Sequence, residues 1–435
     1  MKKTQSLKKN SFKLFRFVVV LVGLIGLMGL SGSLFSATVS ISTGSVGKDV
    51  EALRTYLDMW EKDTGNTARI VTLPASTTDQ FGQYKIWLGN KNSDIDVYLL
   101  DVIWAPQINQ HFIDLSRAFS KEAKEHFPAI IASQTIGKKL VAIPFFTDAP
   151  MLYYRKDLLS KYNTKPPKNW EELKSIAKII QNGERAAGNE KMWGFVFQGN
   201  AYEGLTCDAL EWINSYGGGS IVDARGQITV NNPSAVKAID FMATFVGDIS
   251  PPGVLTYQEE EARGVWQLGN AVFMRNWPYA YSLGNSSDSA VRKKFDVVTL
   301  PRGTTPNSKS AATLGGWNLG ISEYSKNKEA AISLVKFLAG KKIQKLNAVN
   351  LSKLPTLPAL YEDKEVLKAA PFFATMKDVL AEAVGRPSGP TQKKYNEVSK
   401  EFWTAVHAVL AGDKNAKTSL AELERKLKRV RGRKW

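Results

Sequence analysis

The chain has few of the residues on which most enzymes depend. Its 435 residues include one cysteine, Cys207, and three histidines, His111, His126 and His407. A single cysteine excludes an intramolecular disulfide and is expected to be a buried hydrophobic side chain. The histidines are too far apart to match a zinc-binding pattern. Neither a Gly-x-Ser-x-Gly elbow nor a glycine-rich loop followed by lysine occurs. The sequence therefore predicts no metal, no cofactor and no nucleophilic catalyst.

Carboxylates are the exception, since the chain has 41 aspartates and glutamates. Two of them facing each other across a sugar ring would be enough for glycoside hydrolysis. A secreted enzyme that acts on glycosides therefore stays open as an alternative.

The chain also lacks an apolar run long enough to cross a bilayer comfortably, which takes about 20 residues. Its longest run, Phe17–Leu30, follows six basic residues and precedes the small residues around Ser36 and Ala37. This order is typical of a secretory signal peptide, predicted here over residues 1–37, with an uncleaved N-terminal anchor as the alternative. No cysteine follows the run, so lipid attachment is excluded. We expect an unlipidated protein in the periplasm of a Gram-negative cell.

The net charge of +17 depends partly on this first segment. Residues 1–37 hold six basic and no acidic residues, so the rest of the chain carries +11. A second basic cluster lies near the C-terminus, from Arg425 to Lys434. Such a cluster could bind nucleic acid, but in an exported protein a solvated helix end is favoured.

From Thr38 onward short apolar strands alternate with amphipathic helices, which predicts an α/β fold with largely parallel pairing. The expected strands are Thr38–Ser42, Ala68–Leu73, Asp96–Leu100, Val141–Pro144, Met151–Arg155, Val272–Arg275 and Phe295–Leu300. Helices are expected after Lys48, over Trp170–Ile180, from near Thr206, and over Asn232–Phe245, Thr256–Leu268 and Lys328–Leu338. The segment 145–149 is a natural place for the chain to cross between two domains.

Aromatic residues stand where strands end. Trp104 follows Asp101, Trp277 and Tyr279 flank a proline, and Trp317 follows a Gly-Gly pair. Pyranose rings stack on flat aromatic faces, while their hydroxyls bind carboxylates, amides and guanidinium groups. Core packing is the alternative for each tryptophan, but these positions favour ligand binding.

Five stretches resemble a known family. They are LLDVIW (Leu99–Trp104), LYYRKDLL (Leu152–Leu159), YEGLTCD (Tyr202–Asp208), RNWPYA (Arg275–Ala280) and SAATLGGW (Ser310–Trp317). The chain is similar to the family 1 extracellular solute-binding proteins of carbohydrate ABC importers, and within them to the trehalose/maltose branch.

The resemblance implies a two-lobed periplasmic-binding-protein fold of type II, in which each lobe is a mixed, largely parallel sheet flanked by helices and the ligand cleft lies between the lobes. We expect the N-terminal lobe to comprise residues 38–146 and 312–350, and the C-terminal lobe residues 147–311 and 351–435.

The resemblance also implies the ligand contacts. The expected site residues are Asp49, Gln80, Asp101, Trp104, Phe146, Asp148, Trp277, Tyr279, Gly316, Trp317 and Arg386. Two of them depart from the branch, which commonly has tyrosine where this chain has Phe146 and arginine where it has Gln80. The lost hydroxyl and charge are expected to weaken binding or to change which disaccharide fits.

The sequence therefore predicts a periplasmic receptor that binds an α-glucoside disaccharide, trehalose or maltose first and sucrose next. We expect a monomer that delivers its sugar to the membrane permease subunits of an ABC importer and binds no nucleic acid. The alternatives are a receptor for another oligosaccharide or a polyol, and the glycoside-acting enzyme.

Export is directly testable. The N-terminus of the protein recovered from the periplasm, measured by mass spectrometry, is expected to lie between Leu34 and Val39, because cleavage should follow the small residues at the end of the apolar run. An intact Met1 on a membrane-bound product would contradict this prediction.

Overall fold

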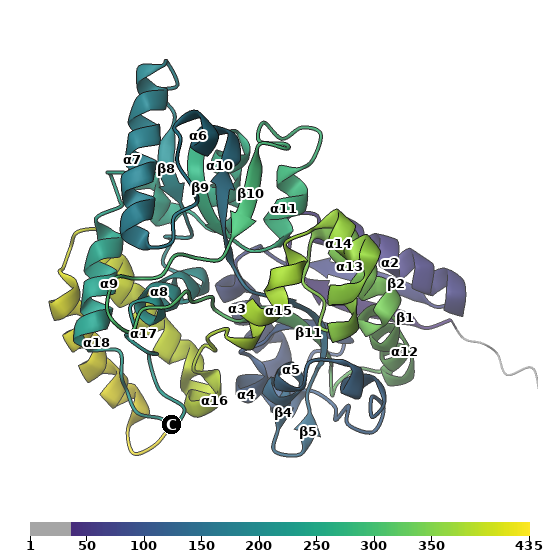
Figure 1. Ribbon diagram of the computed structural model, residues 1–435. Helices are drawn as coiled ribbons and strands as arrows, with labels where there is room; N and C mark the ends of the chain where they lie inside the picture. The colour runs from purple at the N-terminus through teal and green to yellow at the C-terminus, as the bar shows by residue number, and fades with distance from the viewer. Residues whose placement is uncertain (1–35) are drawn as a thin grey trace, which may run out of the picture.

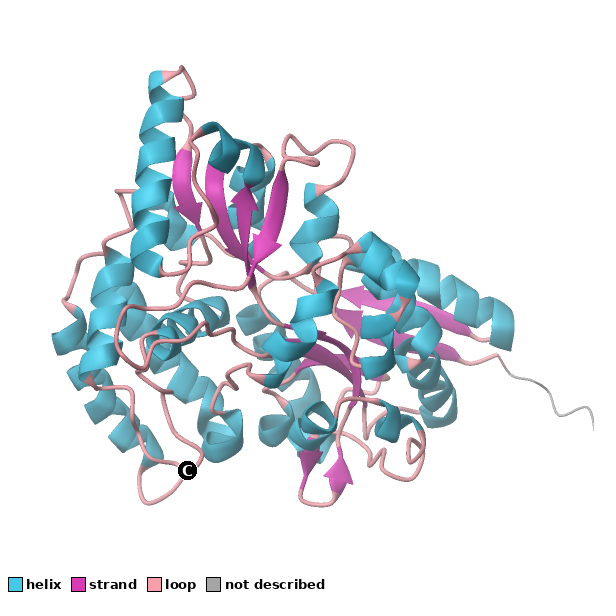
Figure 2. Ribbon diagram, viewed as in Figure 1, coloured by secondary structure: helices cyan, strands magenta, loops and turns pink. Residues whose placement is uncertain are grey.

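The computed structural model describes residues 36–435, and the predicted signal peptide lies almost wholly outside them. Two separate sheets, each flanked by helices, form two lobes (Figures 1 and 2). The first sheet has the order β2-β1-β3-β11-β6, with β1 (Thr38–Thr43), β2 (Thr67–Thr72), β3 (Val97–Asp101), β6 (Ile143–Asp148) and β11 (Gly315–Ile321). The second has the order β10-β7-β9-β8, with β7 (Met151–Arg155), β8 (Trp193–Val196), β9 (Ala271–Asn276) and β10 (Phe295–Val298).

Helices around the first sheet follow from apolar residues at helical spacing. Helix α2 (Asp49–Thr64) buries Leu53, Leu57 and Trp60 and ends at Gly65, whose φ of 73° is in the left-handed region. The other helices of this lobe are α3 (Thr77–Gly89), α4 (Ala105–Ile108), α5 (Pro128–Ser133) and α12 (Lys328–Ala339), with the 3₁₀ turns η1 (Asn109–His111) and η2 (Glu122–Glu125) and the hairpin β4 (Thr135–Ile136) and β5 (Lys139–Leu140).

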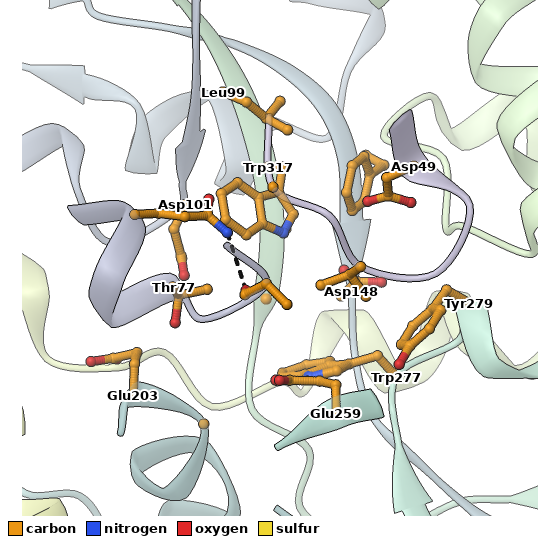
Figure 3. A pocket seen from close by; sticks show the side chains of 18 of the residues that line it. Asp49, Thr77, Leu99, Asp101, Asp148, Glu203, Glu259, Trp277, Tyr279 and Trp317 are labelled. Carbon is orange, nitrogen blue, oxygen red and sulfur yellow. Dashed lines mark hydrogen bonds between the residues drawn. The ribbon is translucent and has the colours of Figure 1, made fainter. Parts of the chain in front are cut away.

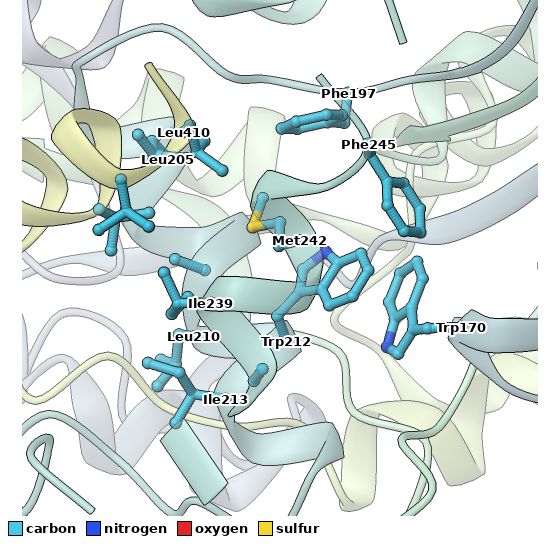
Figure 4. Close-up of a cluster of buried hydrophobic side chains, with 14 of the residues drawn as sticks. Trp170, Phe197, Leu205, Leu210, Trp212, Ile213, Ile239, Met242, Phe245 and Leu410 are labelled. Carbon is cyan, nitrogen blue, oxygen red and sulfur yellow. The ribbon is translucent and has the colours of Figure 1, made fainter. Parts of the chain in front are cut away.

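The second lobe contains a large aromatic core (Figure 4). Trp170 and Trp212 stack with ring centroids 3.8 Å apart, and Phe245 packs edge-on against Trp212. The helices on this side are α6 (Lys156–Lys161), α7 (Trp170–Ala186), α8 (Glu203–Ser215), α9 (Pro233–Ala243), α10 (Glu259–Gln267), α11 (Tyr279–Gly284), α17 (Tyr395–Leu410) and α18 (Ala416–Arg431), with η3 (Pro252–Thr256). The basic C-terminal cluster lies at the end of α18, as expected, and two of its lysines pair with glutamates.

The remaining helices lie on either side of the last crossing and connect the two lobes. They are α13 (Lys341–Leu351), η4 (Pro358–Glu362), α14 (Lys364–Ala369), α15 (Phe373–Ala381), α16 (Ser388–Thr391) and η5 (Gln392–Lys394). Ala348 of α13 and Phe373 of α15 pack in one buried cluster with Met151 and Tyr153 of the second sheet. The lobe boundaries given above stay a prediction.

The prediction of largely parallel sheets is wrong. Only β1 with β2, β1 with β3, and β8 with β9 pair in parallel, whereas β3–β11, β11–β6, β10–β7 and β7–β9 are antiparallel. The reason is the crossing of the chain. Strand β6 leaves the first sheet toward the second lobe and β11 returns from it, so β11 must run against both β6 and β3.

The crossing segments meet one another. Strand β6 continues to Asp148, well beyond the predicted strand Val141–Pro144, and β7 begins at Met151. The backbone N–H of Thr147 donates to the carbonyl of Leu354, 2.9 Å away, and Thr313 pairs with Val384. The crossing segments therefore meet between the two sheets, where the candidate site is found.

Candidate ligand-binding site

A pocket of about 790 Å³, partly open to solvent, lies between the two lobes (Figure 3). Ten of the eleven predicted site residues line it: Asp49, Gln80, Asp101, Phe146, Asp148, Trp277, Tyr279, Gly316, Trp317 and Arg386. Residues far apart in sequence and drawn from both lobes are therefore brought together.

The first lobe contributes polar groups at the ends of its elements. Asp49 begins α2, Asp101 ends β3, and Gln80 lies in the first turns of α3. Strand β11 adds Trp317, whose ring is half-buried. The neighbouring Gly316 has a φ of 132°, and a Cβ at that position would lie 2.8 Å from the carbonyl oxygen of Phe146. Only glycine allows β11 to approach β6 here.

The second lobe contributes aromatic rings. Strand β9 ends at Asn276 and is followed by Trp277, while Tyr279 begins α11. The Tyr279 hydroxyl donates to Glu260, 2.6 Å away, and the Trp277 Nε1–H points to Glu259 at 3.4 Å. In Figure 3 Trp277, Glu259 and Tyr279 form one wall, opposite Trp317 and Asp101.

Arg386 joins the two lobes at one end of the pocket. Its guanidinium lies 2.6 Å from Asp101 of the first lobe and 3.0 Å from Glu203 of α8 in the second. All three side chains are less than a tenth exposed. Glu203 also accepts hydrogen bonds from Tyr395 and, at 2.7 Å, from Ser399.

Lys353 supplies the second positive charge. Its ammonium lies 2.7 Å from Asp49 and 3.8 Å from the centre of the Phe146 ring. The residue follows α13 on the last crossing segment and is only 5% exposed. A lysine this buried requires a partner, and Asp49 provides it.

Burial changes the acidity of the pocket carboxyls. It raises the pKa of Asp148 from 3.8 to about 8, since the nearby Lys353 offsets only part of this effect and Asp49 and Asp101 add to it. Burial also raises the pKa of Asp49, Glu203 and Glu259. The pocket therefore favours neutral or hydrogen-bonded carboxyls over free charges.

Trp104 is the predicted site residue that does not line the pocket. Its ring is 2% exposed and packs against Phe81 and Tyr84, and its centroid lies 5.5 Å from that of Trp317 in a T-shaped arrangement. The expectation that its loop position would direct it to a ligand is wrong, because the backbone turns into α4 and buries the ring behind Trp317.

Sequence reasoning missed several lining residues, among them Gly44, Thr77, Glu203, Glu259 and Lys353. Glu203 lies within the YEGLTCD stretch, so that motif could have indicated it. Lys353 stands in the last crossing segment with no motif around it. Cys207 also lines the pocket and is 2% exposed, which confirms a buried hydrophobic side chain, and burial raises the pKa of its thiol.

Residues 36–435 hold neither a metal-binding cluster nor a membrane-spanning helix. No group of three or more His, Cys, Asp or Glu side chains in this range has the arrangement of a metal site. None of the helices described here has both the length and the apolar character needed to span a bilayer.

Comparison with known proteins identifies the family. The model of the bacterial extracellular solute-binding proteins matches residues 44–345, which is more than half of the chain. The chain belongs to this family. A probable ABC transporter-binding protein of Deinococcus radiodurans is 48% identical over 422 residues, covering 97% of this chain and all of that protein.

Solved structures agree with this assignment. The maltose-bound MalE3 of T. maritima is 38% identical, with a TM-score of 0.86 over 91% of this chain and all of that one. A ribitol-bound solute-binding protein of Agrobacterium radiobacter K84, 23% identical with a TM-score of 0.80 over 91% of this chain and 99% of that one, shares the fold. The two-lobed architecture and the role of the family as sugar receptors of ABC importers are thus shown.

Stacking can be tested at Trp277. Trp277→Ala is expected to weaken sugar binding by about 1–3 kcal/mol, because an aromatic anchor is removed from a desolvated wall. Trp193→Ala is a matched control, since both tryptophans pack against an arginine at 4.3 Å but Trp193 lies outside the pocket. Calorimetric titration measures both; equal affinities in the two variants would contradict a contact with the ligand.

The raised pKa of Asp148 predicts a pH-dependent stability. A carboxyl whose pKa is higher in the folded state favours folding most below its unfolded pKa of 3.8, and this contribution is lost as pH rises through about 8. The free energy of unfolding of Asp148→Asn, measured relative to that of the wild type, should therefore increase from pH 5 to pH 9. Denaturant unfolding at both pH values measures this; a difference independent of pH would contradict it.

Proposed function

We propose that this protein is the periplasmic receptor of an ATP-driven importer and binds an α-glucoside disaccharide, maltose or trehalose first and sucrose next. The observation that carries the proposal is the composition of the pocket, where Trp277 and Tyr279 of one lobe face Trp317 and Asp101 of the other. Flat rings and hydrogen-bonding groups on opposite walls suit a ligand with apolar faces and a polar rim.

The aromatic walls account for the ring faces of a sugar. The Arg275 guanidinium packs over the Trp277 ring, 4.3 Å from its centre. Trp317 forms a T-shaped pair with the buried ring of Trp104. Two rings fixed in this way lose little side-chain freedom when a pyranose stacks on them, so that binding costs little ordering entropy.

The polar lining accounts for the hydroxyls. Five carboxylates line the pocket, namely Asp49, Asp101, Asp148, Glu203 and Glu259, beside the amide of Gln80. Carboxyl groups form directed hydrogen bonds with hydroxyls, and bonds to the ion-paired members of the set are stronger than neutral ones. This set supports the proposal that the ten predicted residues around the pocket contact the ligand.

The choice of a disaccharide rests on one relative. The 38%-identical MalE3 is described with bound maltose. Related proteins described with mannitol, ribitol and galactooligosaccharide supply the alternatives, a polyol or another oligosaccharide.

Transport without chemistry is part of the proposal. Three of the carboxylates are engaged in ion pairs, Asp49 with Lys353, and Asp101 and Glu203 with Arg386. A general acid and a nucleophile for glycoside cleavage would have to be free to exchange a proton or to attack the sugar. We infer that the loaded protein, a monomer, passes its sugar intact to the membrane permease subunits.

Calorimetric titration with maltose, trehalose, sucrose and mannitol tests this function. At least one of the disaccharides is expected to bind more tightly than mannitol, and to raise the melting temperature, because a ligand at 100 times its dissociation constant adds about 2.7 kcal/mol to stability.

The same samples decide between a receptor and an enzyme. After hours of incubation with the protein, chromatography should recover the disaccharide unchanged. Tighter binding of mannitol would show that the ligand is a polyol and not a disaccharide. Release of glucose would show that the protein is a glycosidase and not a receptor.

A further inference from the structure

The amide of Gln80 is fixed in one orientation. Its Nε2 donates to the carbonyl oxygens of Pro74 and Ala75, at 2.9 and 3.1 Å. A flipped amide would bring its own oxygen against two carbonyl oxygens, so the hydrogen bonds determine which end is which. The acceptor atom, Oε1, is therefore the end left over.

That acceptor has no partner. Gln80 is 1% exposed and lines the pocket, and among residues 36–435 no donor lies within hydrogen-bond distance of its Oε1. Buried carbonyl oxygens are nearly always paired, because leaving one unpaired costs free energy. Because Gln80 lines the pocket, a molecule bound there can supply the missing donor.

The surroundings are shaped to hold this amide. A Cβ on Gly44, which also lines the pocket, would lie 2.4 Å from Nε2 of Gln80 and 3.1 Å from its Cδ. The loop after β1 thus needs a residue without a side chain at position 44 for the amide to take this place. The arrangement is built by two elements, α3 and the loop after β1.

Arg386 adds the complementary atom. Its Nε is buried and, within the described residues, has no acceptor, while its two other nitrogens bind Asp101 and Glu203. These are the two unpaired buried side-chain atoms of the pocket lining, one acceptor and one donor. A hydroxyl donates and accepts, whereas an ether, a fluorine or a carboxylate offers only acceptors.

We infer that Gln80 determines ligand specificity by requiring a hydrogen-bond donor, an O–H of the sugar, at its fixed acceptor oxygen. This deepens the proposed function and rests on it. At the position where the family resemblance leads one to expect an arginine, which only donates, this chain presents an acceptor, so the polarity of that contact is reversed.

The charges of the lining exclude anionic ligands as well. Its two cations, Lys353 and Arg386, are already paired with carboxylates. The lining also contains the carboxyl groups of Asp148 and Glu259 and the amide oxygen of Gln80, which form no ion pair within residues 36–435. A uronic acid or sugar phosphate would bring more acceptors to an acceptor-rich wall. The site is therefore selective for uncharged polyhydroxyl ligands.

A double-mutant cycle between protein and sugar tests this inference. The probe is whichever of maltose, trehalose and sucrose the wild-type protein binds most tightly, together with its monodeoxyfluoro analogues, each of which replaces one donor by an acceptor. We expect one analogue to bind the wild type at least about tenfold more weakly than its parent. The Gln80→Met variant keeps the length of the side chain but lacks the acceptor. It should bind the same analogue as tightly as the parent sugar.

Two variants serve as controls. Gln83→Met lies on the same helix but outside the pocket and should retain the wild-type pattern. Gly44→Ala should push the Gln80 amide aside and weaken binding, and it should have much less effect when Gln80 is already methionine. Circular dichroism of each variant verifies folding.

The outcomes separate the two levels of the argument. The wild type could bind a disaccharide while the loss of affinity for every analogue is the same with glutamine or methionine at position 80. In that case water is the donor to the acceptor oxygen, and the inference is overturned while the proposed function stands. If the wild type binds none of the three disaccharides, the proposed function fails and this inference fails with it.

Discussion

The site depends above all on the buried ion pairs of Arg386 with Asp101 and Glu203. One carboxylate belongs to the first lobe and the other to the second, and all three groups are almost fully removed from water. Removing one member of such a group commonly costs about 3–5 kcal/mol, because it leaves a charge buried without a partner. The guanidinium therefore stabilises the arrangement in which the two walls of the pocket, with Gln80, Trp277 and Trp317, face each other.

This constraint connects the fold to ligand binding. The crossing segments place Asp148, Gly316 and Lys353 between the lobes, so that the pocket is lined by residues of both sheets and of the crossings. A ligand that contacts both lobes binds the closed arrangement better than the open one and must shift the population toward closure. The ionic bridge and the sugar stabilise the same arrangement, one from within the protein and the other from solution.

Much of this arrangement could be predicted from the sequence. Strand Met151–Arg155 and the start of the helix at Trp170 were predicted correctly, because apolar alternation and the Asn169 cap are local signals. The family resemblance located ten of the pocket residues, five of them within the quoted motifs. The orientation of Trp104 and the antiparallel pairing of β11 were predicted wrongly, since both depend on contacts between segments more than 200 residues apart. Lys353 was beyond sequence reasoning for the same reason, since its partner Asp49 lies near the other end of the chain. The polarity of the Gln80 amide depends instead on the carbonyl groups of Pro74 and Ala75, whose orientation no sequence pattern indicates.

The central claim is that a sugar binds between two lobes and closes them. Small-angle X-ray scattering of the wild-type protein, with and without a saturating concentration of the disaccharide that binds most tightly, tests it most directly. The account predicts a smaller radius of gyration in the loaded protein, because the ligand favours the arrangement in which Arg386 contacts both Asp101 and Glu203. A radius of gyration unchanged by a sugar that calorimetry shows to be bound would contradict it.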